Sequence, residues 1–270
     1  MLGQFVIPAA PRGLSAKALL RNTERGGEDF DRRPGISVDL RVFRGGLLQY
    51  RDENFTNIPL NGLVEISSDT CPAIAGDQSN LLIVARCSLP GADGYFGQEH
   101  QLIYENRKTG AVSSLLYDQL PVPPQSASMS PIVVIAPKVW IGRSINSFVA
   151  FPSTNSRIDP GTQRRPLDVK VLDERGRVVV TKQVSLQENS TLLFDVKESL
   201  SGNIEIDDTP KLFTVVAKGG AAMFAVVTFT INEATGNFAL EHSLPPMYYA
   251  SGNMQRIRSE SLEFGTARSN

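Results

Sequence analysis

The sequence has few of the residues that usually carry chemistry. It contains 2 cysteines and 2 histidines in 270 residues. The histidines, His100 and His242, have no second histidine at the spacing of a metal site, and two cysteines cannot build a cysteine-based structural zinc site or a dense disulfide framework. We therefore expect no metal and no cofactor.

Charge of one sign and long apolar runs are also lacking. The 27 basic and 28 acidic residues give a formal net charge of −1, which supplies no basic field for nucleic acid. No run approaches the roughly 20 apolar residues that a membrane-spanning helix needs. We expect neither nucleic-acid binding nor a membrane span.

The first ten residues do not form a convincing signal peptide. They lack a basic n-region, and Pro8 interrupts their apolar run. The sequence therefore predicts a cytoplasmic protein, unless the chain is a processed or truncated form.

The two cysteines, Cys71 and Cys87, lie in the same half of the chain. Free cysteine is commonly buried, so two buried thiols are the favoured interpretation. One disulfide stays open as an alternative, if the flanking strands pair.

What the sequence does have is a series of short strand signals. Runs rich in Val, Ile, Leu, Phe and Thr are separated by Gly, Pro, Asn and Asp, a pattern typical of antiparallel sandwiches. Residues 167–180 read as a β-hairpin around Gly176, and residues 36–50 repeat that hairpin around Gly45 and Gly46. The predicted fold class is all-β, with little helix.

The two hairpins belong to an internal repeat. Three blocks match in order: residues 5–8 with 148–152, residues 32–42 with 164–171, and residues 101–112 with 226–238. Three matches in register are hard to obtain by chance, so we expect two tandem antiparallel β-sandwich domains related by internal duplication. The first copy carries inserted loops near residues 21–33 and 67–96.

Composition also suggests the boundaries. Prolines and serines in residues 121–131 read as a linker, because proline favours extended chain and removes ladder donors. We predict a first sandwich at 1–125, a second at 126–250 and a polar tail at 251–270. Residues 132–146, which include Trp140, precede the second copy, so we expect the first sandwich to lack the corresponding edge strand. Residues 13–21 have moderate helical propensity inside a segment that the repeat marks as strand and loop.

Motifs for catalysis are not visible. There is no G-x-S-x-G elbow and no glycine-rich phosphate loop after a strand. We interpret Asp207-Asp208 and the group Glu28, Asp29 and Asp31 as solvated acidic turns, since neither has the spacing of a calcium loop. Both histidines are expected to have surface or rim positions.

Exposed aromatics and repeated arginines are the remaining candidates for binding. Tyrosine and phenylalanine in loops can stack on sugar rings or anchor protein interfaces. Paired arginines before the same strand of each copy suggest a shared structural role such as pairing with an acidic group, with an anion site as the weaker interpretation. The candidate ligand-binding residues are Tyr95, Phe96, Tyr248, Tyr249, Arg32, Arg33, Arg164 and Arg165.

These observations favour a non-catalytic structural or interaction protein. It would use sandwich edges and loops to bind a protein partner or to self-associate as a homo-oligomer. One alternative is carbohydrate binding through the loop aromatics. A further alternative is a hydrolase whose site lies between the sandwiches and uses His100 with acidic residues.

Overall fold

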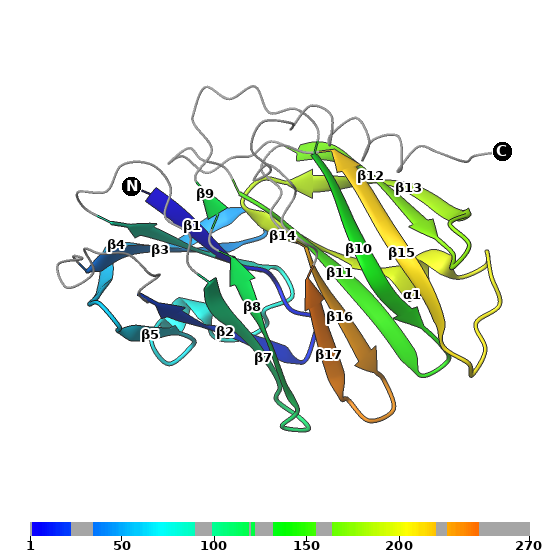
Figure 1. The fold of residues 1–270 in the computed structure, drawn as a ribbon, viewed down its shortest axis with the longest axis horizontal. Helices are drawn as coiled ribbons and strands as arrows, with labels where there is room; N and C mark the ends of the chain where they lie inside the picture. The colour runs from blue at the N-terminus through cyan, green and yellow to red at the C-terminus, as the bar shows by residue number, and fades with distance from the viewer. Residues whose placement is uncertain are drawn as a thin grey trace, which may run out of the picture.

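The computed structural model describes residues 2–22, 35–89, 99–118, 120–121, 132–154, 164–219 and 226–242. Most of these residues lie in strands, which form four antiparallel sheets (Figure 1). In the described part of the chain, no helix is long and apolar enough to cross a membrane. Because strands predominate over helix in the described residues, the all-β prediction is confirmed.

The N-terminal part of the chain builds sheets A and B. Sheet A has the order β4-β3-β6-β1-β9, and sheet B has the order β5-β2-β7-β8. Their strands are β1 (Leu2–Ile7), β2 (Leu14–Arg21), β3 (Ile36–Arg44), β4 (Leu47–Ile58), β5 (Leu63–Ile66), β6 (Leu81–Ser88), β7 (Glu99–Asn106), β8 (Val112–Asp118) and β9 (Leu120–Pro121). A 3-10 helix, η2 (Pro72–Ile74), lies between β5 and β6. We call this pair of sheets the first sandwich.

The later part of the chain builds sheets C and D. Sheet C has the order β10-β15-β12-β13, and sheet D has the order β14-β11-β16-β17. Their strands are β10 (Ile132–Ile141), β11 (Ile145–Ser153), β12 (Arg164–Leu172), β13 (Val178–Gln187), β14 (Ser190–Asp195), β15 (Lys211–Gly219), β16 (Val227–Asn232) and β17 (Phe238–His242). A short helix, α1 (Val196–Leu200), follows β14. We call this pair of sheets the second sandwich.

The two sandwiches have the same strand order. The order β4-β3-β6-β1 in sheet A corresponds to β13-β12-β15-β10 in sheet C, and sheets B and D correspond strand for strand. This correspondence supports the repeat, although a common origin of the two halves stays a prediction.

The strand order corrects two details of the sequence interpretation. β1 corresponds to β10 and β2 to β11, so the match of residues 5–8 with 148–152 paired an apolar run with the wrong strand. The first sandwich therefore does not lack an edge strand. It has one more than the second among the described residues, because β9 pairs with β1.

Residues 14–21 form strand β2 and not a helix. Buried and partly buried positions alternate along the whole strand, with Leu14, Ala16, Ala18 and Leu20 facing the core. Such a period of two fits a strand between β5 and β7, whereas a helix would bury every third or fourth residue. Tertiary pairing overrides the helical propensity here.

The β7–β8 and β16–β17 hairpins repeat the same turn chemistry. The Asn106 side chain accepts from Lys108 N at 3.0 Å, and the Asn232 side chain accepts from Ala234 N at 3.0 Å. The glycines that follow, Gly110 and Gly236, have φ values of +72° and +74°. Both glycines therefore have the positive φ that a bulged hairpin turn requires. The hairpins also touch, since Asn106 Nδ2 donates to Gly236 O at 2.8 Å.

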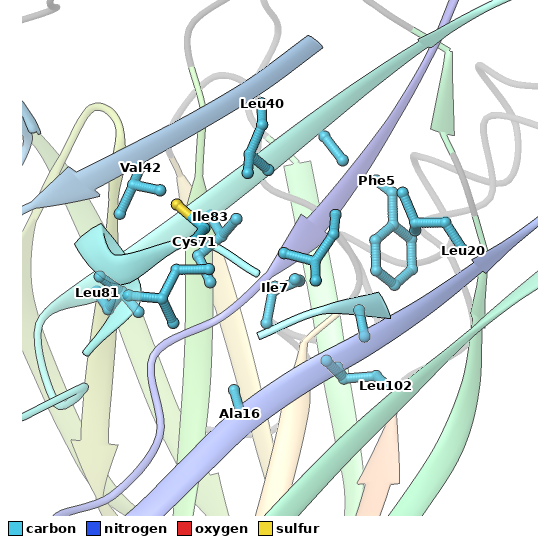
Figure 2. Close-up of a cluster of buried hydrophobic side chains, with 14 of the residues drawn as sticks. Phe5, Ile7, Ala16, Leu20, Leu40, Val42, Cys71, Leu81, Ile83 and Leu102 are labelled. Carbon is cyan, nitrogen blue, oxygen red and sulfur yellow. The ribbon is translucent and has the colours of Figure 1, made fainter. Parts of the chain in front are cut away.

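The first core lies between sheets A and B. Figure 2 shows side chains from the two sheets turned toward one another, with Phe5, Leu40 and Ile83 from sheet A opposite Leu20 and Leu102 from sheet B. All five are fully buried. In the second sandwich, Leu167, Val169 and Val171 of β12 face the core, as the alternation in the sequence predicts.

The equivalent glycines offer a matched test of how the hairpins touch. We expect Gly110→Ala to lower the free energy of unfolding by about 1–2 kcal/mol, the cost of positive φ for a residue with a Cβ. A Cβ at Gly110 meets nothing within 4 Å, whereas a Cβ at Gly236 would lie 2.8 Å from Thr109 Cγ2. Gly236→Ala should therefore cost about 1–3 kcal/mol more, as overpacking does. Urea unfolding of both variants measures the difference, and equal losses would contradict the contact.

Candidate interaction surfaces

One aromatic pair joins the two sandwiches. The ring of Tyr104 in β7 meets the ring of Phe229 in β16 edge to face, with centroids 4.7 Å apart. The Tyr104 hydroxyl donates to Pro8 O at 2.9 Å, so its polar end is satisfied although the side chain is fully buried. The T-shaped geometry is the favourable one for aromatic rings.

The outer face of sheet D surrounds this pair. Ala150, Val227 and Phe229 are fully buried and belong to the same apolar cluster as the core of the first sandwich. Partly buried residues of the same sheet pack beside them: Phe148, Leu193, Ile231, Phe238 and Leu240. β8 and β17 lie close together where sheets B and D meet (Figure 1). The first core therefore continues into the second half of the chain.

Hydrogen bonds also connect the two sandwiches, across the contact region that we call the joint. Gln4 Nε2 donates to Thr154 Oγ1 at 2.8 Å, and both residues are buried. Thr191 Oγ1 accepts from Ala9 N at 3.0 Å and lies 3.3 Å from Leu81 O, to which it donates. Each bond joins one sandwich to the other, so the two halves are held in one relative orientation.

A charged cluster lies on the outer face of sheet A. Arg41 and Asp39, two residues apart on β3, form an ion pair at 3.0 Å with side chains 6% and 22% exposed. Arg86 is the register partner of Asp39 on β6. Burial lowers the pKa of Arg86, the charge of Arg41 lowers it further, and Asp39 raises it. The negative charge of Asp39 therefore stabilises the positive charges of Arg41 and Arg86, both of which are partly removed from water.

The outer face of sheet B differs from that of sheet D in being open. Leu63, Val112 and Leu116 are 60%, 61% and 49% exposed. The partly buried Leu19 and Ile103 share this face by strand alternation and register. Charged residues are interspersed with them: Lys17 and Arg21 on β2, Glu65 on β5 and Glu105 on β7. The outer face of sheet D is therefore buried in the second sandwich, whereas the equivalent outer face of sheet B in the first sandwich is exposed to solvent.

Two of the eight candidate ligand-binding residues lie in the described structure. Arg164 begins β12 and is exposed, while Arg165 pairs with Glu188 at 3.4 Å. Glu188 follows β13 beside the joint with the first sandwich, so Arg165 has the acidic partner that the sequence suggested. The other candidates lie outside the described residues: Tyr95, Phe96, Tyr248, Tyr249, Arg32 and Arg33.

His100 is not at the rim, and that prediction is wrong. It is 1% exposed, its Nδ1 accepts from Arg21 N at 3.2 Å, and its ring meets Phe5 edge to face at 4.8 Å. Because His100 faces inward on β7, it packs as a core residue. His242, at the end of β17, is half-buried. The sequence did not distinguish these two environments, since both histidines follow a glutamate beside a strand.

Both cysteines are free and buried, as the favoured interpretation held. Burial raises the pKa of Cys87 to about 12 and also raises the pKa of Cys71. Neither thiol is therefore an activated nucleophile at neutral pH, because the thiolate is the reactive form.

The acidic turn at Asp207-Asp208 is solvated and paired with basic residues. Asp207 meets Lys211 at 3.0 Å, and Asp208 meets Arg143 at 3.1 Å. The hydrogen bond from Lys211 is the largest influence that lowers the pKa of Asp207. Within the described ranges, no group of three or more His, Cys, Asp or Glu residues could hold a metal ion. Glu28, Asp29 and Asp31 lie outside those ranges.

Comparison with known proteins does not assign this chain to a family. No protein family and no curated protein matches the sequence. Among solved structures, a glycosyl hydrolase family 2 member from Bacteroides cellulosilyticus is 11% identical, covering 91% of this chain and 28% of that chain with a TM-score of 0.17. A β-glucuronidase from Bacteroides uniformis is 10% identical, covering 86% and 26%, with a TM-score of 0.16. This chain spans about a quarter of either protein, and TM-scores this low carry no argument.

Sequence reasoning did not find the residues of the joint or of the open face. Residues 226–229 are all buried, whereas partly buried and buried positions alternate along residues 101–104. The first pattern is that of a strand covered on both faces, and the second is that of a strand with one face toward water. The sequence does not record this difference, because residues 226–229 and residues 101–104 each contain one polar residue and three apolar or aromatic ones.

The shared core makes a prediction about cooperativity. Phe229→Ala should lower the free energy of unfolding by about 3–5 kcal/mol, and it should split thermal unfolding into two transitions because the ring bridges both sandwiches. Phe194→Ala is the matched control, since Phe194 belongs to the core of the second sandwich alone. Differential scanning calorimetry should show two peaks only for Phe229→Ala. One peak for both variants would show that the coupling of the two halves does not depend on Phe229.

The charged cluster on the outer face of sheet A predicts that removing its carboxylate charge lowers stability more than removing one from an exposed ion pair. Asp39→Asn keeps the shape of the side chain and removes its charge, leaving Arg41 and Arg86 without that anion. We expect a loss of about 1–3 kcal/mol, below the value for a fully buried pair because Asp39 is partly exposed. Glu53→Gln, in the exposed pair with Arg51, should change stability by less than about 0.5 kcal/mol. Guanidinium unfolding tests the contrast, and similar losses in both variants would contradict it.

Proposed function

We propose that this chain is a non-catalytic structural or interaction protein that binds a protein partner or itself through its sandwiches. The observation that supports this is the contrast between two equivalent sheets. The outer face of sheet D is apolar and buried by the first sandwich, while the outer face of sheet B presents Leu63, Val112 and Leu116 to water. Because the equivalent face of sheet D packs against protein, we expect the exposed leucines and valine of sheet B to contact protein as well.

The rigid joint between the sandwiches also supports the proposal. Both halves share one core and direct buried hydrogen bonds such as Gln4 to Thr154. A preorganised surface loses little conformational entropy on binding, which favours recognition by faces and edges. The carbohydrate alternative rests on aromatic residues outside the described ranges, and the hydrolase alternative rests on His100, which packs in the core.

The double variant Val112→Lys/Leu116→Lys tests the proposal. In clarified extract of cells that make the protein, the wild-type chain should elute from a sizing column above monomer size, and the variant should elute as a monomer. Because both side chains are exposed, the variant should keep its melting temperature. Leu47→Lys, at an exposed leucine on the β3–β4 hairpin away from the face, is the control and should elute like wild type. A wild-type chain that elutes as a monomer in extract would overturn the proposal.

A further inference from the structure

We infer that Lys182 prevents a further strand from pairing with the edge of sheet C at β13. β13 is the last strand of that sheet, and among the described residues no strand lies on its other side. Residues 181–183 in its middle are exposed, and its pairing with β12 is regular from Val180 to Gln187. A long, regular edge of this kind presents N–H and C=O groups to which a strand of another chain can bond.

The side chains of β13 that face the core form an apolar row with one exception. Val180 and Leu186 are buried in the core of the second sandwich, and Val184 packs against that core. Lys182 occupies the remaining position of the row, because its register partner on β12 is Val169, which is fully buried. Side chains on one face of a strand recur every two residues, so Lys182 lies between Val180 and Val184.

A strand added to this edge would continue the core-facing row across the sheet. Its side chains would lie beside Lys182, and the ammonium group would lose water without gaining an anion. Burying an unpaired charge is costly, whereas an apolar side chain at the same position would gain from the contact. A charged residue that points inward from an edge strand therefore keeps that edge unpaired.

The first sandwich has a charged residue at the equivalent place. On β4, the edge strand of sheet A that corresponds to β13, Asp52 is the register partner of the fully buried Leu40. Leu40 matches Val169 in the internal repeat. Asp52 and Lys182 have opposite signs, so the two edges share a charge and not a residue type. β4 also has two register shifts against β3, which hinder pairing by themselves, so β13 offers the clearer test.

Removing the charge tests the inference with purified protein. All variants carry Val112→Lys/Leu116→Lys, which we call the background chain, so that the face of sheet B makes no contribution. In this background, Lys182→Val makes the row from Val180 to Leu186 entirely apolar. It should form dimers or larger species at a concentration about tenfold or more below that which the background chain needs. Sedimentation velocity measures the sizes.

Three further variants separate the charge from other effects. Lys182→Glu keeps a charge in the core-facing row and should sediment like the background chain. Thr181→Val adds an apolar β-branched side chain to the same strand on its opposite face, and it should also sediment like the background chain. Lys182→Thr removes the charge without adding an apolar side chain, so it should associate even if Lys182→Val does not fold. Circular dichroism melts check folding.

Hydrogen exchange identifies the contact. A strand added to the edge bonds the N–H groups of β13 that point away from β12, so exchange in residues 178–187 should slow when Lys182→Val associates. The inference is rejected if folded Lys182→Val and Lys182→Thr sediment like the background chain, if they associate without slower exchange in β13, or if Thr181→Val associates equally. The proposed function concerns the face of sheet B and stands or falls separately.

Discussion

The contact of Tyr104 with Phe229 is the interaction on which the rest of the arrangement depends. It joins the core of sheets A and B to the outer face of sheet D, so residues of the second sandwich form part of the hydrophobic core of the first. Buried rings contribute both area and a preferred angle. Because of this contact, folding of the core also sets the relative orientation of the two halves. The exposed faces of the two sandwiches are then held in fixed positions relative to each other.

The fold could be read from the sequence to a considerable depth. The alternation of Leu167, Val169 and Val171 placed β12 in a sheet with one buried face, and Gly176 and the pair Gly45-Gly46 located two hairpins. These signals are local, which is why one sequence suffices to find them. The residue-by-residue match failed at β1, because a short apolar run such as Phe5-Val6-Ile7 fits several strands of a sandwich equally well.

The surfaces could be read much less well. The alternation along β2 says that Leu19 and Leu20 face opposite sides, but it does not say which side is covered by a distant part of the chain. His100 illustrates the same difficulty, since a glutamate before it and a strand around it gave no sign of burial against Phe5. Packing between halves depends on residues more than 100 positions apart, and no local pattern records it.

Two sheet edges carry prolines, and this limits the ways in which copies of the chain could grow into a larger assembly. β9 ends at Pro121, which has no N–H to donate, and β10 contains Pro137 beside a shift in register and the exposed Lys138. At these edges an incoming strand would find its ladder interrupted, so open-ended polymerisation by strand addition is obstructed there. Contacts through a sheet face stop after one partner, which keeps any association finite.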